Sequence, residues 1–357
     1  MKESTSRIAT LDGLRGVAIF SVIIFHTYSR WSEYIPWTTG SKEFPLFKYG
    51  YLGVELFFLI SGFVIYLTLN KCISYREFIF RRWIRLFPAM LIVTILVLAS
   101  STLLYERPAG KPNLIDVLPG LFFIEPSFFT KTFGAETSAL EWSFWTLFIE
   151  VKFYLLFGGL YFLSRKRALF ILSLIFMSGF VYKLVIHFCP SLQIKYFESI
   201  LFDILSINYF GWFIIGALFY LAYLEKNKNY IFLSILLLLP TIIQTTCQDV
   251  AEASAGLVVY LIFLLSIVNH NFSKIVACRI LVFIGFISYP LYLIHENALV
   301  SLTIKTHKHY SAIPNMLTPL PGLLLIILLA FLIAKYIEPF VKKCILAFIR
   351  RGLNCQV

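Results

Sequence analysis

The sequence predicts an all-α membrane protein that crosses the bilayer about ten times. Hydrophobic residues make up 59% of its 357 residues and charged residues only 14%, and the mean hydropathy is +0.82. Soluble domains are closer to about 45–50% apolar and about 25% charged. Apolar stretches recur from residue 14 to residue 340 with no polar domain between them. We therefore expect one polytopic membrane domain over residues 1–357.

Ten apolar stretches are long enough to be membrane spans, because a helix needs about 20 apolar residues to cross the hydrocarbon core. The first stretch follows Lys2 and Arg7 but lacks a small-residue cleavage pattern after it. We expect it to be retained and not removed as a signal peptide. The expected spans are 12–29, 50–70, 86–105, 141–163, 168–188, 204–224, 230–247, 254–270, 280–303 and 318–339.

Lysine and arginine are unevenly divided between the two sets of connections, and this predicts the orientation. One set holds eighteen of them: 1–11, 71–85, 164–167, 225–229, 271–279 and 340–357. The other set holds nine: 30–49, 106–140, 189–203, 248–253 and 304–317. Because cytoplasmic connections carry the excess, both termini are expected in the cytoplasm. The net charge of +12 then reflects topology and contact with anionic membrane lipids, and no soluble basic module is present to bind nucleic acid.

The six cysteines show no spacing typical of a metal site, so no bound metal is predicted. Cys189 and Cys247 lie near the predicted outer face, where a disulfide can persist, and the sequence leaves open whether they pair. The other four lie near the reducing, cytoplasmic face: Cys72, Cys278, Cys344 and Cys355.

Arg15 and His26 are ionisable residues of the first apolar stretch, with ten residues between them. Eleven steps of about 100° return a helix to within about 20° of its starting face and advance it by about 16 Å. Taken singly, Arg15 is explained by snorkelling to the interface and His26 by a hydrogen bond in the core. On one face together they favour a functional site, because intramembrane ionisable groups are costly and usually functional.

Charged residues also lie at the ends of the second and third expected spans. Glu55, in GYLGVELFFLISGFVI (50–65), is either an interfacial acid or the partner of a cation or a histidine. The stretch SYREFIFRRWIRLFP (74–88) presents three arginines at helical spacing: Arg81, Arg82 and Arg85. Such a cluster is either a topology anchor or a binding site for phosphate groups, which suit the guanidinium fork.

The fourth expected span contains LEWSFWTLFIEVKFYLLF (140–157), with Glu150 about half-way along it. This carboxylate is expected to face protein or water, with Lys152 as a neutralising neighbour. The aromatic residues Trp145 and Tyr154 are either interfacial belt residues or part of the wall of an acyl or sugar pocket.

The ninth expected span contains ISYPLYLIHENAL (287–299). Pro290 predicts a kink or an irregular turn, because proline removes a helical hydrogen bond. Tyr289 and His295 flank this point and are candidates for substrate contact.

Together these stretches resemble the acyltransferase 3 family of integral membrane acyltransferases, in the same order and over essentially the whole chain. The most specific parts are the arginine-ten-histidine spacing, GVELFFLISGF, RRWIRLFP, WTLFIEVKFYLL and ISYPLYLIH. Glu55, Thr146 and Lys152 stand where this family more often has aspartate, serine and glutamine. The family modifies bacterial surface polysaccharides, lipopolysaccharide O-antigens and related carbohydrates. No appended extracytoplasmic esterase-like domain is expected.

The resemblance implies transfer of an acyl group, most often acetyl from acetyl-CoA, to a sugar hydroxyl. Carried onto this chain, it implies that His26 is the catalytic base, a role that suits a neutral imidazole. Glu150 or Glu55 would hold its tautomer, as the acid does in a hydrolase triad.

The donor and acceptor sites follow from the same resemblance. Arg15 would belong to the donor site, and it or the arginine cluster of the third span (Arg81, Arg82 and Arg85) would hold the CoA phosphates. The acceptor would be a polysaccharide, an oligosaccharide or a lipid-linked sugar at the inner (plasma) membrane. Its expected contacts are Trp145, Tyr154, Tyr289 and His295.

Three other classes of protein have a similar composition. A transporter or flippase of lipid-linked glycans is typically built from internal repeats, and none is visible. A glycosyltransferase that uses lipid-phosphosugars needs clustered acidic ligands in its outer loops, where this chain has only dispersed acids. A membrane scaffold without chemistry leaves the placement of Arg15 and His26 unexplained. Acyl transfer is therefore favoured.

The orientation is tested by single cysteines introduced near residues 40, 120 and 310 of a variant that lacks the native cysteines. A membrane-impermeant maleimide should label all three in intact cells, because the lysine and arginine asymmetry places these connections outside. A cysteine introduced near residue 166 is the cytoplasmic control. Protection of all three outer positions until the membrane is permeabilised would reverse the predicted orientation.

Overall fold

The computed structural model describes residues 2–41, 44–246, 249–310 and 312–354, and helices are the only regular elements among them. Nine helical segments in these ranges are long and apolar enough to cross a membrane. The chain is therefore an all-α, multi-pass membrane protein, as its composition predicts. It divides into two compact units: unit 1 (Met1–Ala18, Leu52–Arg81 and Thr146–Val282) and unit 2 (Ile19–Tyr51, Arg82–Trp145 and Phe283–Val357).

Each of the nine candidate spans overlaps one of the ten expected spans. The remaining expected span, 230–247, corresponds to the shorter apolar helix α11 (Asn229–Thr245). Its 17 residues extend over about 26 Å, against a hydrocarbon core of about 30 Å. The candidate spans are Ala9–Arg30, Gly50–Leu69, Tyr75–Ser100, Trp142–Leu163, Ala168–Phe188, Ile207–Glu225, Val250–Val268, Arg279–His309 and Asn315–Arg350.

The third span begins earlier than the hydropathy pattern indicates. Helix α4 runs over Tyr75–Ser100, whereas the expected span began at residue 86. The polar stretch before residue 86 lowers the local hydropathy, but arginine is a good helix former and its long side chain reaches polar surroundings from a helix end. The three arginines of the cluster therefore lie on α4 itself.

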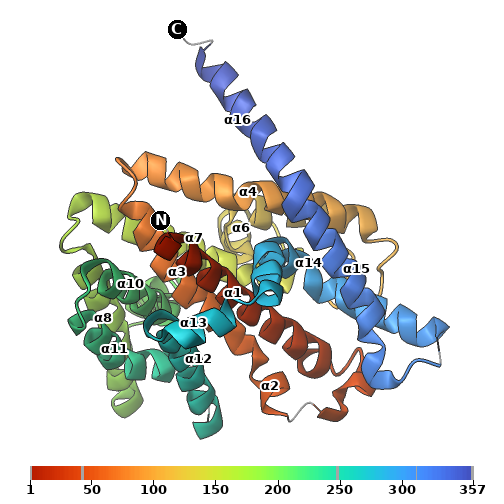
Figure 1. The fold of residues 1–357 in the computed structure, drawn as a ribbon, viewed down its shortest axis with the longest axis horizontal. Helices are drawn as coiled ribbons and strands as arrows, with labels where there is room; N and C mark the ends of the chain where they lie inside the picture. The colour runs from red at the N-terminus through yellow and green to blue at the C-terminus, as the bar shows by residue number, and fades with distance from the viewer. Residues whose placement is uncertain (1, 42–43, 247–248, 311, 355–357) are drawn as a thin grey trace. The chain divides into compact units, whose positions relative to one another are not determined.

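Unit 1 is built around α10, which packs against α3, α8 and α11 (Figure 1). The unit also contains the first part of α1 (Lys2–Phe25). Its other helices are α3 (Gly53–Leu69), α7 (Trp145–Leu163), α8 (Ala168–Phe188), α9 (Lys195–Glu198), α10 (Phe210–Glu225), α11, α12 (Val250–Val268) and α13 (His270–Val276).

A reciprocal pair of glycines brings α3 and α10 into close contact. A Cβ on Gly62 of α3 would lie 1.9 Å from the Phe213 carbonyl oxygen, and one on Gly216 of α10 would lie 2.0 Å from the Leu59 carbonyl oxygen. Small residues permit such backbone approach between membrane helices, where packing provides much of the association free energy. This contact therefore requires glycine at both positions.

Unit 2 consists of the end of α1 and of helices from two separate parts of the chain, one before residue 146 and one from residue 283 onward. Helix α14 runs through Pro290 without an interruption, so the irregular turn expected there is not formed. The helices are α2 (Pro45–Lys48), α4 from Arg82 onward, α5 (Val117–Phe122), α6 (Pro126–Phe133), α14 (Arg279–His309) from Phe283 onward, α15 (Pro319–Leu332) and α16 (Glu338–Asn354).

The last helices of unit 2 follow one another as one long rod (Figure 1). A π-helical segment, Ile333–Ile337, joins α15 to α16.

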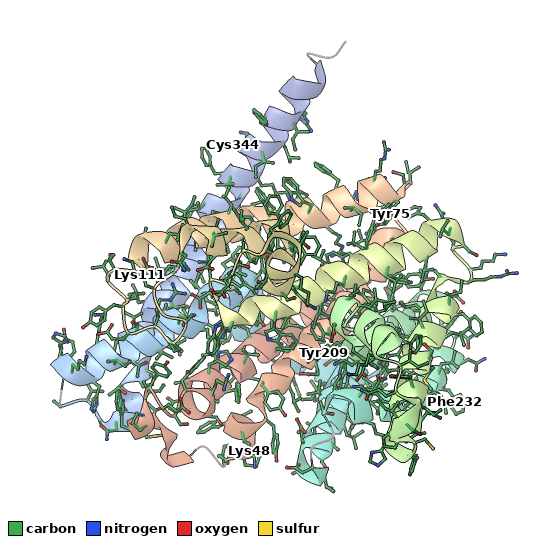
Figure 2. All side chains as sticks on the ribbon, turned by 180° about the vertical axis from the view of Figure 1, so that it is seen from behind. Lys48, Tyr75, Lys111, Tyr209, Phe232 and Cys344 are labelled. Carbon is green, nitrogen blue, oxygen red and sulfur yellow. The ribbon has the colours of Figure 1, made fainter. Side chains whose placement is uncertain are left out.

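Cys344 is exposed on α16, and Phe232 is exposed on α11 of unit 1 (Figure 2). Exposed apolar side chains of this kind are what a lipid environment accommodates. Cys189 is also exposed, whereas Cys247 lies outside the described residues, so their pairing stays open.

The glycine contact between α3 and α10 is tested by Gly216→Ala. The added methyl group has no room against the Leu59 carbonyl, so we expect a loss of stability of about 1–3 kcal/mol. Gly159→Ala on α7 is the matched control, because a Cβ there meets nothing within 4 Å and alanine favours the helix by up to about 1 kcal/mol. The measurement is the thermal unfolding of purified protein, and equal midpoints for the two variants would contradict the close contact.

Candidate active site

His26 and His295 lie side by side in unit 2. Their ring centroids are 4.9 Å apart and their planes make an angle of 30°. His26 begins the π-helical turn His26–Arg30 that follows α1, and such turns are frequent at functional sites. His295 lies in the middle of α14. The structure therefore brings together the residue expected to act as base and one of those expected to bind the acceptor.

His295 is completely buried, and one of its ring nitrogens is fixed by the backbone. Its Nδ1 lies 2.8 Å from the carbonyl oxygen of Tyr292. Because a carbonyl only accepts a hydrogen bond, Nδ1 carries the proton and Nε2 keeps its lone pair. Nε2 is buried without a hydrogen-bond partner among the described residues. An unsatisfied buried polar atom is costly, so Nε2 is a candidate contact for a substrate hydroxyl.

Glu296 is the carboxylate that faces His26. Its Oε1 lies 3.8 Å from His26 Nδ1, and the two side chains are only 4% and 13% exposed. The other oxygen, Oε2, accepts a hydrogen bond of 2.7 Å from the backbone N–H of Ser143. The separation of 3.8 Å is longer than a hydrogen bond, and His26 Nδ1 has no hydrogen-bond partner among the described residues. The nearby negative charge still favours the tautomer that is protonated on Nδ1, and in that tautomer Nε2 carries the lone pair.

Glu296 was not among the residues selected from the sequence, although it directly follows His295. It is an acid in the middle of a predicted span, and this is the same signal that singled out Glu150. Within unit 2 the carboxylate beside His26 is Glu296. Glu55 and Glu150 belong to unit 1, so their expected role beside His26 stays a prediction.

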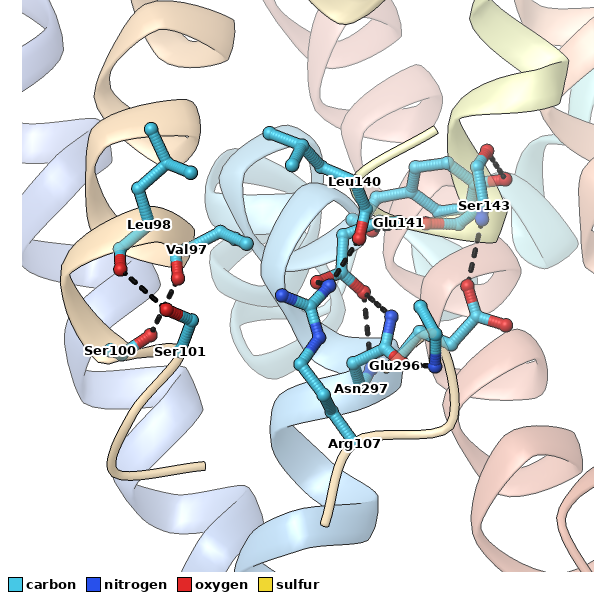
Figure 3. A network of polar contacts seen from close by, with 12 residues as sticks. Val97, Leu98, Ser100, Ser101, Arg107, Leu140, Glu141, Ser143, Glu296 and Asn297 are labelled. Carbon is cyan, nitrogen blue, oxygen red and sulfur yellow. Dashed lines mark hydrogen bonds and ion pairs between the residues drawn. The ribbon is translucent and has the colours of Figure 1, made fainter. Parts of the chain in front are cut away.

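A buried ion pair lies next to this group in unit 2 (Figure 3). Arg107 donates to the Leu140 carbonyl, and its Nη2 lies 3.2 Å from Glu141 Oε1; both side chains are nearly fully buried. Glu141 Oε2 accepts hydrogen bonds from the backbone and the side-chain amide of Asn297. The Asn297 side-chain oxygen accepts from the backbone N–H of Ala109 at 2.8 Å.

A second set of bonds joins the same segment to α14. The Tyr292 hydroxyl donates to the Ser143 carbonyl at 3.0 Å, and Ser143 also holds Glu296 through its backbone N–H. The segment between α4 and α7 is therefore fastened to α14 at the turn that carries His295 and Glu296. Sequence reasoning found only dispersed acids in the outer loops and did not identify the pair formed by Arg107 and Glu141.

The arginines expected to bind the donor lie on α4 and α1. In unit 2, Arg82 is buried, and the guanidinium of Arg85 lies 5.2 Å from the centre of the Tyr289 ring and 3.8 Å from Glu338 Oε1. In unit 1, Arg81 pairs with Glu77 at 2.6 Å and Arg15 with Asp12 at 2.6 Å. Each of these pairs is partly exposed, so none excludes an incoming phosphate.

Two expected residues of unit 1, Glu150 and Tyr154, contact each other. Glu150 accepts hydrogen bonds from the hydroxyl groups of Tyr154 and Ser61, the latter at 2.7 Å. The Lys152 ammonium donates to Ser206 and to the carbonyl of Asp203, and its expected role as the neutralising neighbour of Glu150 stays a prediction.

Two further expected residues have different surroundings. Glu55, in unit 1, is buried. Trp145, in unit 2, is partly exposed.

No group of three histidine, cysteine, aspartate or glutamate side chains is placed to hold a metal ion within the described ranges.

Comparisons with known proteins agree with the resemblance seen in the motifs. The profile of a family described as an acyltransferase domain matches residues 8–335. The chain is 28% identical over 167 residues to the peptidoglycan O-acetyltransferase OatA of Listeria monocytogenes, which covers 43% of this chain and 24% of that protein. It is 32% identical over 201 residues to the O-acetyltransferase OatA of Staphylococcus aureus. That alignment covers 50% of this chain and 29% of the relative. The chain thus matches 24% and 29% of the lengths of these two relatives. No solved structure matches.

The buried ion pair is tested by Arg107→Ala. The change leaves Glu141 buried without its cation, which we expect to cost about 3–5 kcal/mol of stability. The double variant Arg107→Met/Glu141→Gln should recover part of this loss, because no uncompensated charge remains. Lys305→Ala is the control: it removes a more exposed ion pair with Glu106, and such pairs contribute about 0–1 kcal/mol. Equal losses of thermal stability in Arg107→Ala and Lys305→Ala would refute the role given to the buried pair.

Proposed function

The chain belongs to the acyltransferase family whose domain it matches over residues 8–335, and we propose that it is a membrane O-acetyltransferase. The proposed reaction moves an acetyl group from acetyl-CoA to a hydroxyl of a cell-surface or exported carbohydrate. The observation that carries this proposal is the pairing of His26 with Glu296 next to the buried imidazole of His295. Both units are proposed to form one acyltransferase domain in the inner (plasma) membrane.

His26 is the proposed general base. The charge of Glu296 favours the proton on Nδ1, and Nε2 takes the proton of the acceptor hydroxyl as the hydroxyl oxygen bonds to the acyl carbon. The carbon–sulfur bond of the thioester breaks, and the imidazolium returns the proton to the leaving thiolate. The positive charge formed on His26 is stabilised by the Glu296 carboxylate 3.8 Å away, as the acid of a hydrolase triad stabilises its histidine.

His295 is proposed to bind the acceptor hydroxyl and not to replace His26 as base. Its Nε2 lone pair is buried without a partner in the described part of the chain. An unsatisfied buried acceptor is costly, and a hydroxyl that donates to Nε2 would remove this cost. A hydroxyl held there lies beside the His26 ring, because the two ring centroids are 4.9 Å apart. Positioning of this kind contributes to rate by fixing the reacting oxygen near the base.

Acetyl-CoA supplies an activated acetyl thioester on a long arm with an anionic nucleotide at its other end. The arginines of α4 fit such an anion, because Arg81 and Arg85 are about half exposed and a guanidinium fork suits phosphate oxygens. Arg15, in unit 1, is proposed as a further residue that binds the donor, as the family resemblance implies. The predicted cytoplasmic orientation of these arginines places them where acetyl-CoA is available.

The carbohydrate acceptor is supported by the relatives, one of which is named for peptidoglycan. Peptidoglycan lies outside the plasma membrane, and the predicted topology places His26 toward that side. The proposed acceptor class is therefore a polysaccharide, an oligosaccharide or a lipid-linked sugar.

His26→Ala tests the proposed chemistry in purified protein supplied with labelled acetyl-CoA and an oligosaccharide acceptor. Loss of a general base typically lowers the rate by about 10²–10⁴-fold, and saturating acceptor should not restore it. His295→Ala should mainly raise the KM for the acceptor, because its proposed role is binding. His187→Ala is the matched control, since this histidine is exposed on α8 of unit 1. Near-normal turnover by folded His26→Ala would refute the mechanism.

A further inference from the structure

Trp142 is an exposed indole supported by a buried one. The Trp142 side chain is 44% exposed at the short 3₁₀ turn Trp142–Phe144. Its ring centroid lies 5.0 Å from that of Trp31, with the planes at 43°. Trp31 is only 5% exposed and packs against Ile35 and Val300. Because Trp31 is fixed in this cluster, the exposed ring of Trp142 has a rigid support.

Arg30 adds a cation to this aromatic pair. Its guanidinium carbon lies 4.8 Å from the centre of the Trp31 ring and 6.0 Å from that of Trp142, within the range of cation–π attraction. A guanidinium stacked on a ring keeps its N–H groups in its own plane, where they can still donate. The indole N–H of Trp31 is also buried without a hydrogen-bond partner in the described ranges.

Trp142 and Arg30 are linked through the chain to the proposed catalytic pair of His26 and Glu296. Trp142 directly precedes Ser143, whose backbone N–H holds the Glu296 carboxylate at 2.7 Å. Arg30 ends the π-helical turn that His26 begins. All of them belong to unit 2. A molecule resting on Trp142 would therefore lie close to the His26–Glu296 pair.

We propose that Trp142, with Trp31 and Arg30 beneath and beside it, is the subsite on which a sugar ring of the acceptor stacks. This inference rests on the proposed function and adds the place where the carbohydrate is held. A pyranose ring combines an apolar C–H face with hydroxyl groups at its edge. The C–H face can stack on an exposed indole, which offers a large rigid apolar surface. The hydroxyl groups can accept hydrogen bonds from the N–H groups of Arg30.

Aromatic residues also gather at the membrane–water interface without any ligand. If Trp142 had only an interfacial role, its substitution would affect sugar binding no more than that of another exposed aromatic residue of unit 2. Phe122 is such a residue and is 62% exposed at the end of α5. The sugar subsite, in contrast, makes Trp142 specific, because Phe122 lacks a buried ring and a guanidinium beneath it in the contacts described. Phe122→Ala is therefore the matched control.

The experiment measures binding of trisaccharides of glucose, galactose and N-acetylglucosamine to the purified full chain, in a detergent without a sugar headgroup. At least one trisaccharide should bind the wild-type protein. Trp142→Ala should raise its Kd about tenfold, the equivalent of about 1.4 kcal/mol, and Arg30→Ala should raise it less. Trp142→Tyr and Phe122→Ala should stay within about twofold of wild type.

Trp142→Leu separates a lost stacking surface from lost packing, because leucine fills space without offering a ring face. A Kd raised as in Trp142→Ala, at an unchanged melting temperature, supports the subsite. An unchanged Kd in Trp142→Ala, or no binding of any trisaccharide by the wild type, overturns it. If binding depends on Trp142 but the wild type transfers no acetyl group from labelled acetyl-CoA to the bound sugar, the subsite stands and the proposed function fails.

Discussion

A carboxylate buried in an apolar helix bundle is stable only where the fold supplies it with hydrogen-bond donors or a cation, and this constraint organises unit 2. Glu296 accepts a hydrogen bond from the backbone N–H of Ser143. Glu141 pairs with Arg107 and accepts a hydrogen bond from the side-chain amide of Asn297. Each of these partners is far from its carboxylate in the sequence. Satisfying these two acids therefore fixes the segment between α4 and α7 against α14 (Figure 3).

The same arrangement prepares two imidazoles for different tasks. The Tyr292 carbonyl fixes the proton of His295 on Nδ1, and Glu296 favours the same tautomer of His26. Each Nε2 is then left with a lone pair. Of the two rings, only that of His26 has a carboxylate beside it within the described part of the chain, and this carboxylate stabilises the charge that proton abstraction creates. This difference is why His26 is assigned the role of base and His295 that of a hydroxyl-binding residue.

Sequence patterns predicted those features that depend on local composition and periodicity. The all-α, multi-pass fold follows from the length and spacing of apolar runs, and His26 and His295 stood out as ionisable groups within such runs. The partner of His26 was not predicted, because no local pattern encodes the packing of α14 beside the end of α1. The Arg107–Glu141 pair was missed for the same reason, since thirty-three residues separate its members. Helix α4 begins at Tyr75, before the expected start of its span at residue 86. The sequence did not predict this, because hydropathy reports lipid contact and not helical structure.

The central claim is that Glu296 sets the tautomer of His26, and ¹⁵N NMR of histidine-labelled full-length protein measures this directly. The signal of His26, assigned by its loss in His26→Ala, should show protonated Nδ1 and unprotonated Nε2 in the neutral ring. In Glu296→Gln this preference should weaken, while His295 should keep its Nδ1 proton because Tyr292 still accepts it. A neutral His26 protonated on Nε2 in the wild type, or a tautomer unaffected by Glu296→Gln, would contradict the account.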